Sequence, residues 1–81
     1  MSHTPHELAQ EFPDAAEELH RLKMENGHFQ TLSDRYHSIN REIHRIEVGV
    51  EASSDVRAED LKKQRLSLLD EIGGLLSADA P

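Results

Sequence analysis

The feature that most constrains the fold is a seven-residue apolar repeat in the middle of the chain. Apolar side chains recur there at alternating intervals of three and four, at Phe29, Leu32, Tyr36, Ile39, Ile43, Ile46 and Val50. Side chains with this spacing lie along one narrow stripe of an α-helix. So narrow a stripe is typical of a helix covered by one or two partner helices, and less typical of a helix in a broad core. The repeat therefore predicts an all-α fold built on a long helix.

A second stretch downstream has a similar rhythm and supplies the nearest partner for this helix. Its positions are Ala58, Leu61, Arg65, Leu68, Ile72 and Leu75. Laid antiparallel to the first stretch, it places Ala58 opposite Ile46 and Leu75 opposite Phe29, with one constant register between them. We therefore predict an antiparallel two-helix hairpin of the coiled-coil type, with a short extra helical segment at the N-terminus.

Capping and turn residues indicate where the helices begin and end. Thr4 is an N-cap residue followed by proline, and Pro13 ends one helix and can open the next. Gly49 is expected to end the first long helix with a positive φ angle, and Ser54 is an N-cap type for the helix that follows. The expected elements of this single domain are a flexible tail over 1–4, helices over 5–11, 13–48 and 55–76, a turn over 49–54, and a flexible tail over 77–81.

Two residue pairs interrupt the helical pattern. Asn26-Gly27 and Gly73-Gly74 contain residues that cost about 0.5–1 kcal/mol each, relative to alanine, inside a helix. At Asn26-Gly27 the chain could break, bend, or continue as an irregular turn, and we favour one continuous helix. At Gly73-Gly74 we expect the last turn of the second helix to fray or bend.

Arg65 is a charged residue on the apolar seam, where the register places it opposite Ile39. A buried charge is costly unless it is paired. We therefore expect the aliphatic stem of Arg65 to lie along the apolar surface while its guanidinium reaches solvent or Glu42.

The two predicted long helices differ in length, which leaves part of the first one uncovered. At the standard rise the first spans roughly 52 Å and the second roughly 33 Å. Leu19 and Leu22 lie on the overhang. Either the N-terminal segment folds back on them with Leu8 and Phe12, or two chains pair through their overhangs, and we favour a homodimer.

Composition narrows the functional classes. The formal charge of −7 and the aromatic content of 4% argue against non-specific nucleic-acid binding, which depends on cations and base stacking. The chain has no cysteine, hence no disulfide and no thiolate metal site. It also lacks an apolar run of the length that a signal peptide or a membrane span needs, so we expect no membrane association and a cytoplasmic location.

The six histidines require a check for a metal site. Glu17-x-x-His20 and Glu25-x-x-His28 match the spacing of carboxylate-bridged metal sites in helical bundles, but those sites draw their pairs from different helices. Both pairs here fall on one predicted helix, so we expect no metal or cofactor. Because the chain also lacks a glycine-rich phosphate loop and a nucleophile–base signature, we expect no catalytic residue and no enzymatic activity.

Basic side chains gather near the middle of the predicted hairpin, at Arg41, His44, Arg45, Lys62, Lys63 and Arg65. They could simply pair with neighbouring acids, each exposed pair contributing little, or they could form a docking face for an acidic partner. Together with Leu19 and Leu22 they are our candidate interaction surface. We predict a non-catalytic helical module for protein interaction, structure or regulation. The alternative is a regulator associated with RNA or another nucleic acid through Arg41, Arg45, Lys62, Lys63 and Arg65.

Several short blocks resemble a known family. They are His28-Phe29, Leu32, Tyr36, His44-Arg45-Ile46-Glu47, Leu61-Lys62-Lys63, Arg65-Leu66 and Asp70-Glu71-Ile72. Their order and separation are similar to those of the YdcH-like family of small bacterial proteins, over residues 6–76. The resemblance implies a helical hairpin in the bacterial cytosol and adds no catalytic residue. Asn26-Gly27 and Gly73-Gly74 depart from the family pattern.

Overall fold

The computed structural model describes residues 6–79, and all regular structure in this range is helical. The elements are α1 (Leu8–Glu11), the 3-10 helix η1 (Pro13–Ala15), α2 (Ala16–Glu25), α3 (Gly27–Glu47) and α4 (Asp55–Asp79). The all-α prediction is confirmed.

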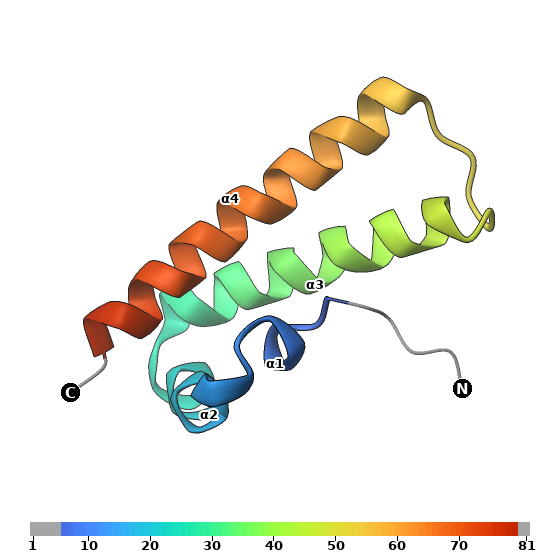
Figure 1. Ribbon diagram of the computed structural model, residues 1–81. Coiled ribbons are helices and arrows are strands. Elements are labelled where there is room, and N and C mark those ends of the chain that lie inside the picture. Colours follow the sequence, from blue (N-terminus) through green and yellow to red (C-terminus); the bar gives the residue numbers. More distant parts are fainter. Residues whose placement is uncertain (1–5, 80–81) are drawn as a thin grey trace.

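The two long helices, α3 and α4, lie side by side with opposite chain directions (Figure 1). α1 and α2 fold back beneath α3, at the end of the pair that is remote from the 48–54 turn (Figure 1). The main core cluster lies at that covered end and contains Leu8, Leu22, Phe29, Leu32, Tyr36, Leu68, Ile72 and Leu76. Within α3 and α4 its members recur every three or four residues, as one helix face requires.

Asn26 separates α2 from α3, so the prediction of one continuous helix over 13–48 is wrong. Its backbone is extended, with φ −123° and ψ 107°, and its side-chain Oδ1 accepts a hydrogen bond from the Phe29 backbone N–H at 3.0 Å. Asparagine is a poor interior helix residue and a strong N-cap. The break also turns α2 back on α3 and α4, which buries Leu22 to 6% exposure. Cap and burial together outweigh the small cost of interrupting the helix.

The first helix also begins later than predicted, at Leu8 instead of Pro5. His6 has φ 63°, a left-handed conformation that cannot belong to an α-helix, and Glu7 is the N-cap. The Glu7 backbone N–H donates to Gln10 Oε1 at 3.2 Å, which satisfies one of the free donors at the helix start. The predicted N-cap Thr4 and the predicted tail over 1–4 lie outside the described residues.

The last helix runs to Asp79 without interruption, so the predicted end at 76, the bend at Gly73-Gly74 and the tail from 77 are wrong as far as residue 79. Ile72 and Leu76, on either side of the glycines, are buried in the core and hold this turn in helical form. A Cβ atom at Gly73 would lie 3.7 Å from the Phe12 ring, so Phe12 packs directly over this glycine. Residues 80 and 81 lie outside the described range.

The turn between α3 and α4 agrees with the sequence signals. Gly49 has φ +80°, which confirms the predicted left-handed glycine after the first long helix. Ser54 Oγ accepts a hydrogen bond from the Arg57 backbone N–H at 3.1 Å, as the N-cap of α4.

Arg65 lies half-buried on the seam, but its partner is not the one that we predicted. Its Nη1 donates to Oδ1 of Asn40 at 3.1 Å, and the Asn40 side chain is only 1% exposed. Glu42 instead pairs with Arg57, whose Nη2 lies 2.5 Å from Glu42 Oε2. A buried amide therefore joins α3 to α4 through a charged donor.

Candidate functional site

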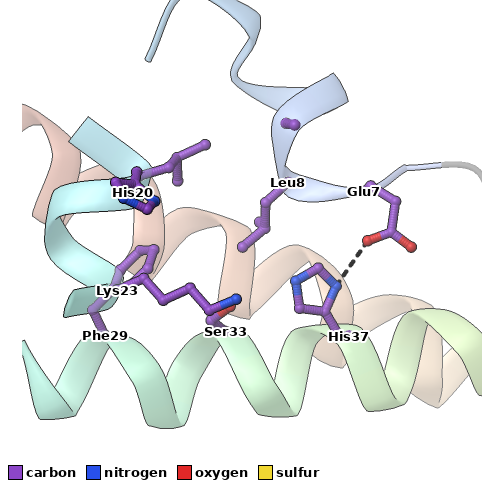
Figure 2. A pocket seen from close by; sticks show the side chains of 9 residues that line it. Glu7, Leu8, His20, Lys23, Phe29, Ser33 and His37 are labelled. Carbon is purple, nitrogen blue, oxygen red and sulfur yellow. Dashed lines mark ion pairs between the residues drawn. The ribbon is translucent and has the colours of Figure 1, made fainter. Parts of the chain in front are cut away.

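An open notch of about 210 Å³ lies where α1, α2 and α3 meet (Figure 2). It is lined by Glu7, Leu8, Ala9, Leu19, His20, Lys23, Phe29, Ser33 and His37. The break at Asn26 creates the notch, because it returns α2 and α1 to the face of α3 that starts at Phe29.

Helical spacing explains which residues reach the notch. Phe29, Ser33 and His37 are four residues apart on α3 and so share one face, and Leu19 and Lys23 share a face of α2 in the same way. Each pair of successive residues is separated by about one turn, roughly 5.4 Å along the axis. The lining is therefore two short rows of side chains on facing helices, closed at one end by α1.

The floor of the notch is apolar. Leu8 and Phe29 are buried, and Leu19 is half-buried. A side chain that entered the notch would contact these three residues and would itself lose water-accessible apolar surface, which is favourable at roughly 25 cal/mol per Å².

The rim of the notch is polar and carries one lysine, Lys23. His37 Nδ1 lies 2.9 Å from Glu7 Oε2, and this contact joins α3 to the start of α1 (Figure 2). On the opposite side, Lys23 extends from α2 across the notch toward Ser33 (Figure 2). Within the part of the chain that the structure describes, no carboxylate pairs with Lys23. Lys23 is therefore available to a negatively charged group of a ligand.

A second set of contacts fastens α1 beside the notch. The hydroxyl of Tyr36 donates to the backbone carbonyl of His6, and His6 Nδ1 lies 2.7 Å from Glu11 Oε1. Burial raises the pKa of Tyr36 to about 12, and the nearby Glu11 and Glu7 carboxylates add to this rise while Arg65 opposes it. The Tyr36 hydroxyl therefore stays protonated and keeps donating to the carbonyl of His6, the residue before the N-cap of α1.

Of the two leucines in the predicted interaction surface, Leu19 lines the notch and Leu22 lies in the core. Leu22 is therefore not exposed for docking in this conformation of the chain. Leu8 is buried, and Phe12 packs against the core cluster, so the single chain adopts the folded-back arrangement that we considered as the alternative to pairing of overhangs. Association of two chains stays a prediction.

The predicted basic surface is not gathered on one face. Arg45 is nine residues after the fully buried Tyr36, and Lys63 is nine before the fully buried Ile72. Nine residues are about two and a half turns, so both cations leave their helices on the side opposite the core. Arg45 Nε lies 3.6 Å from Glu51 Oε1. Of the others, Arg41 and Lys62 are exposed, whereas His44 and Arg65 are half-buried.

Sequence reasoning did not identify Glu7, His20, Lys23, Ser33 and His37 as members of one site. The four-residue spacing of Phe29, Ser33 and His37 is visible in the sequence. It does not reveal, however, that α2 folds back against this face of α3 and forms a notch there. Between residues 6 and 79, no three His, Asp or Glu side chains gather closely enough to hold a metal ion. In the same range, none of the helices combines the length and the apolar character needed to cross a membrane.

Comparison with known proteins identifies the family of this chain. The model of the family "Protein of unknown function (DUF465)" matches residues 29–76, which cover almost all of α3 and most of α4. The chain is 32% identical over 69 residues to "Uncharacterized protein YdcH" of Escherichia coli K12, covering 85% of this chain and 93% of that protein. The protein of the same name from Shigella flexneri matches to the same extent. No solved structure matches the chain significantly. The predicted YdcH-like relationship is confirmed, and the chain belongs to the DUF465 family.

Proposed function

We propose that this protein is a non-catalytic protein-interaction module of the cytoplasm. Its scaffold is an antiparallel, coiled-coil-like hairpin of α3 and α4, and its docking site is the notch between that hairpin and the N-terminal helices. The observation that carries the proposal is the open apolar floor of Leu8, Leu19 and Phe29 beside the available cation Lys23. The cysteine-free composition fits a reducing compartment.

The size of the notch favours a side chain of a partner protein over a cofactor. Pockets that enclose small ligands usually measure about 300–1,000 Å³ and bury most of the ligand. This notch holds about 210 Å³ and is open to solvent. One apolar side chain that projects from a partner helix or loop would fill it and remain connected to its own backbone outside.

The charges of the rim define the chemistry next to that side chain. Lys23 and His20 lie on the α2 side, whereas His37 already faces Glu7. An acidic residue of the partner, adjacent to the inserted apolar one, would meet Lys23. We therefore propose that the recognised segment carries an apolar residue flanked by Asp or Glu.

The alternative of nucleic-acid binding finds no comparable support. Electrostatic binding of a phosphate backbone requires several cations along one continuous surface. Arg45 and Lys63 leave opposite sides of the hairpin, and Arg65 is engaged with Asn40 in the seam.

Site-specific photo-crosslinking in living cells tests the proposed function. Ala9 lines the notch and is exposed, so a benzoylphenylalanine at this position would reach a bound partner without replacing a core residue. Met24, 72% exposed and outside the notch lining, is the matched control position. We expect a discrete crosslinked species from position 9 and none from position 24.

A charge reversal adds specificity to this experiment. Lys23→Glu should abolish the species formed from position 9, whereas Lys63→Glu, which changes another exposed lysine outside the notch, should leave it unchanged. A crosslink that survives Lys23→Glu, or that is equally strong from position 24, would contradict the proposal.

A further inference from the structure

We propose that two copies of this chain can form a domain-swapped dimer in which each copy places its α1 and α2 on the α3–α4 hairpin of the other. The hinge is Asn26, and straightening it would join α2 and α3 into one helix. The inference goes beyond the docking function, because the second copy would supply Leu8, Leu19 and Lys23 to the notch and so complete it in trans.

The hinge consists of a single residue. α2 ends at Glu25 and α3 begins at Gly27, so Asn26 alone is non-helical. Moreover, it already makes both of its backbone bonds of the helical type. Its N–H donates to the Leu22 carbonyl at 2.8 Å, and its carbonyl accepts from the Gln30 N–H at 3.0 Å. Straightening thus requires a change mainly in the φ and ψ of one residue, from −123° and 107° to the helical region.

Two side-chain hydrogen bonds hold the bent form. Asn26 Oδ1 accepts from the Phe29 N–H, and the Gln30 side-chain amide donates to the Lys23 carbonyl. In a continuous helix the same N–H would donate to Glu25, and the same carbonyl would accept from Gly27, through ordinary backbone bonds. Both forms therefore give these two backbone groups a hydrogen-bond partner, the bent form through side chains and the straight form through the backbone.

The apolar pattern is compatible with both forms. Leu19, Leu22, Phe29, Ser33 and Tyr36 would lie on one stripe of a continuous helix, with Asn26 as the polar position between Leu22 and Phe29. In the bent chain this stripe is folded onto itself and buried. In the straight chain it would need another molecule, and the surface that fits it is the face of α3 and α4 on the second copy, from which that copy's α1 and α2 have moved away.

The contacts exchanged in the swap are substantial and specific. Leu8 and Leu22 are 5% and 6% exposed, and the Phe12 ring packs over Gly73 of α4. A second copy offers the same Gly73 surface to the same Phe12. Because closed monomer and swapped dimer share these contacts, the balance between them depends on the hinge and on protein concentration.

Substitutions at the hinge should shift the equilibrium from the bent form toward the straight form. Asn26→Ala removes the cap and Gly27→Ala adds helix propensity, and a Cβ at Gly27 meets no atom within 4 Å. Sedimentation equilibrium over about a hundredfold range of concentration should show dimers of the doubly substituted chain. Its dissociation constant should be at least about a hundredfold lower than that of the natural chain, because both hinges of the dimer are altered. Asn26→Asp, which keeps a capping oxygen, should resemble the natural chain.

A swap is distinguished from other dimers by the Phe12–Gly73 contact. In an equal mixture of ¹³C-labelled and unlabelled chains, refolded together, isotope-filtered nuclear Overhauser spectra should show this contact between different molecules. A monomeric mass for the doubly substituted chain at every concentration, or a Phe12–Gly73 contact found only within one molecule, would overturn the proposal. If that chain does not fold, Asn26→Ala alone is judged by the same two readouts. Neither readout involves Lys23, so failure here leaves the docking proposal to its own crosslinking test.

Discussion

The bond between Arg65 and Asn40 gives the most discriminating test of how α3 and α4 are held together. Arg65→Leu would place an aliphatic side chain on the seam and remove the charged donor from an amide that is 1% exposed. From the sequence alone, with Asn40 left out of account, this substitution is expected to be neutral or stabilising. The structure reverses that expectation.

The magnitude follows from two opposing effects. A hydrogen bond that involves a charged group contributes about 1.5–3 kcal/mol to the free energy of unfolding. Leucine would recover about 1 kcal/mol through apolar burial, since Arg65 is only half-buried. We therefore expect Arg65→Leu to lower the free energy of unfolding by about 0.5–2 kcal/mol.

A double-mutant cycle separates the pair from its surroundings. Arg65→Leu, Asn40→Leu and the double substitution are compared by urea denaturation followed by circular dichroism. The double variant should lose less stability than the sum of the two single variants, because each single substitution leaves one polar partner without the other, and the coupling energy should be about 1–2 kcal/mol. The same cycle on Arg57 and Glu42, whose arginine is exposed, should give less than about 1 kcal/mol. A coupling below about 0.3 kcal/mol for Arg65 and Asn40 would refute this account of the seam.

Four further predictions use single substitutions and pH. Tyr36→Phe should lower the free energy of unfolding by about 1 kcal/mol through loss of the bond to the His6 carbonyl. The pKa of Tyr36 is raised to about 12, so the folded state keeps the phenolic proton longer than the unfolded state. Stability should therefore be lost between about pH 10 and 12, by roughly 2–3 kcal/mol, and a Tyr36→Phe chain with the same alkaline loss would contradict this. Gly49→Ala should cost about 1–2 kcal/mol because φ is +80°, and an unchanged urea midpoint would mean that no left-handed residue ends α3. Gly74→Ala should instead stabilise α4 by about 0.5–1 kcal/mol, since a Cβ there meets no atom within 4 Å, and a lower midpoint would show that the helix is not continuous at that point.

The sequence by itself determined the features that arise from local spacing. The seven-residue repeat identified buried positions of α3, including Phe29, Leu32, Tyr36 and Ile43, because a helix turns the same face inward at those intervals. Gly49 was recognisable for an equally local reason, since only glycine adopts a positive φ angle without a steric cost. These signals need no knowledge of distant residues.

The tertiary structure decided the places where local preferences are nearly balanced. At Asn26 and at Gly73, breaking or continuing the helix differs by only about 1 kcal/mol in local terms. Burial of Leu22 favours the break at Asn26, whereas burial of Ile72 and the Phe12 ring favour continuity at Gly73. The two outcomes are opposite, although both pairs contain weak helix formers.

The notch is another feature that only the tertiary structure decided. Glu7, Lys23 and His37 are up to 30 positions apart, and they meet only because the chain reverses at Asn26. No local pattern indicates that reversal, since the apolar stripe is compatible with a straight helix as well. The physical reason is that the free energy of packing α1 and α2 against α3 and α4 comes from contacts between distant segments, and these exist only once the chain has folded.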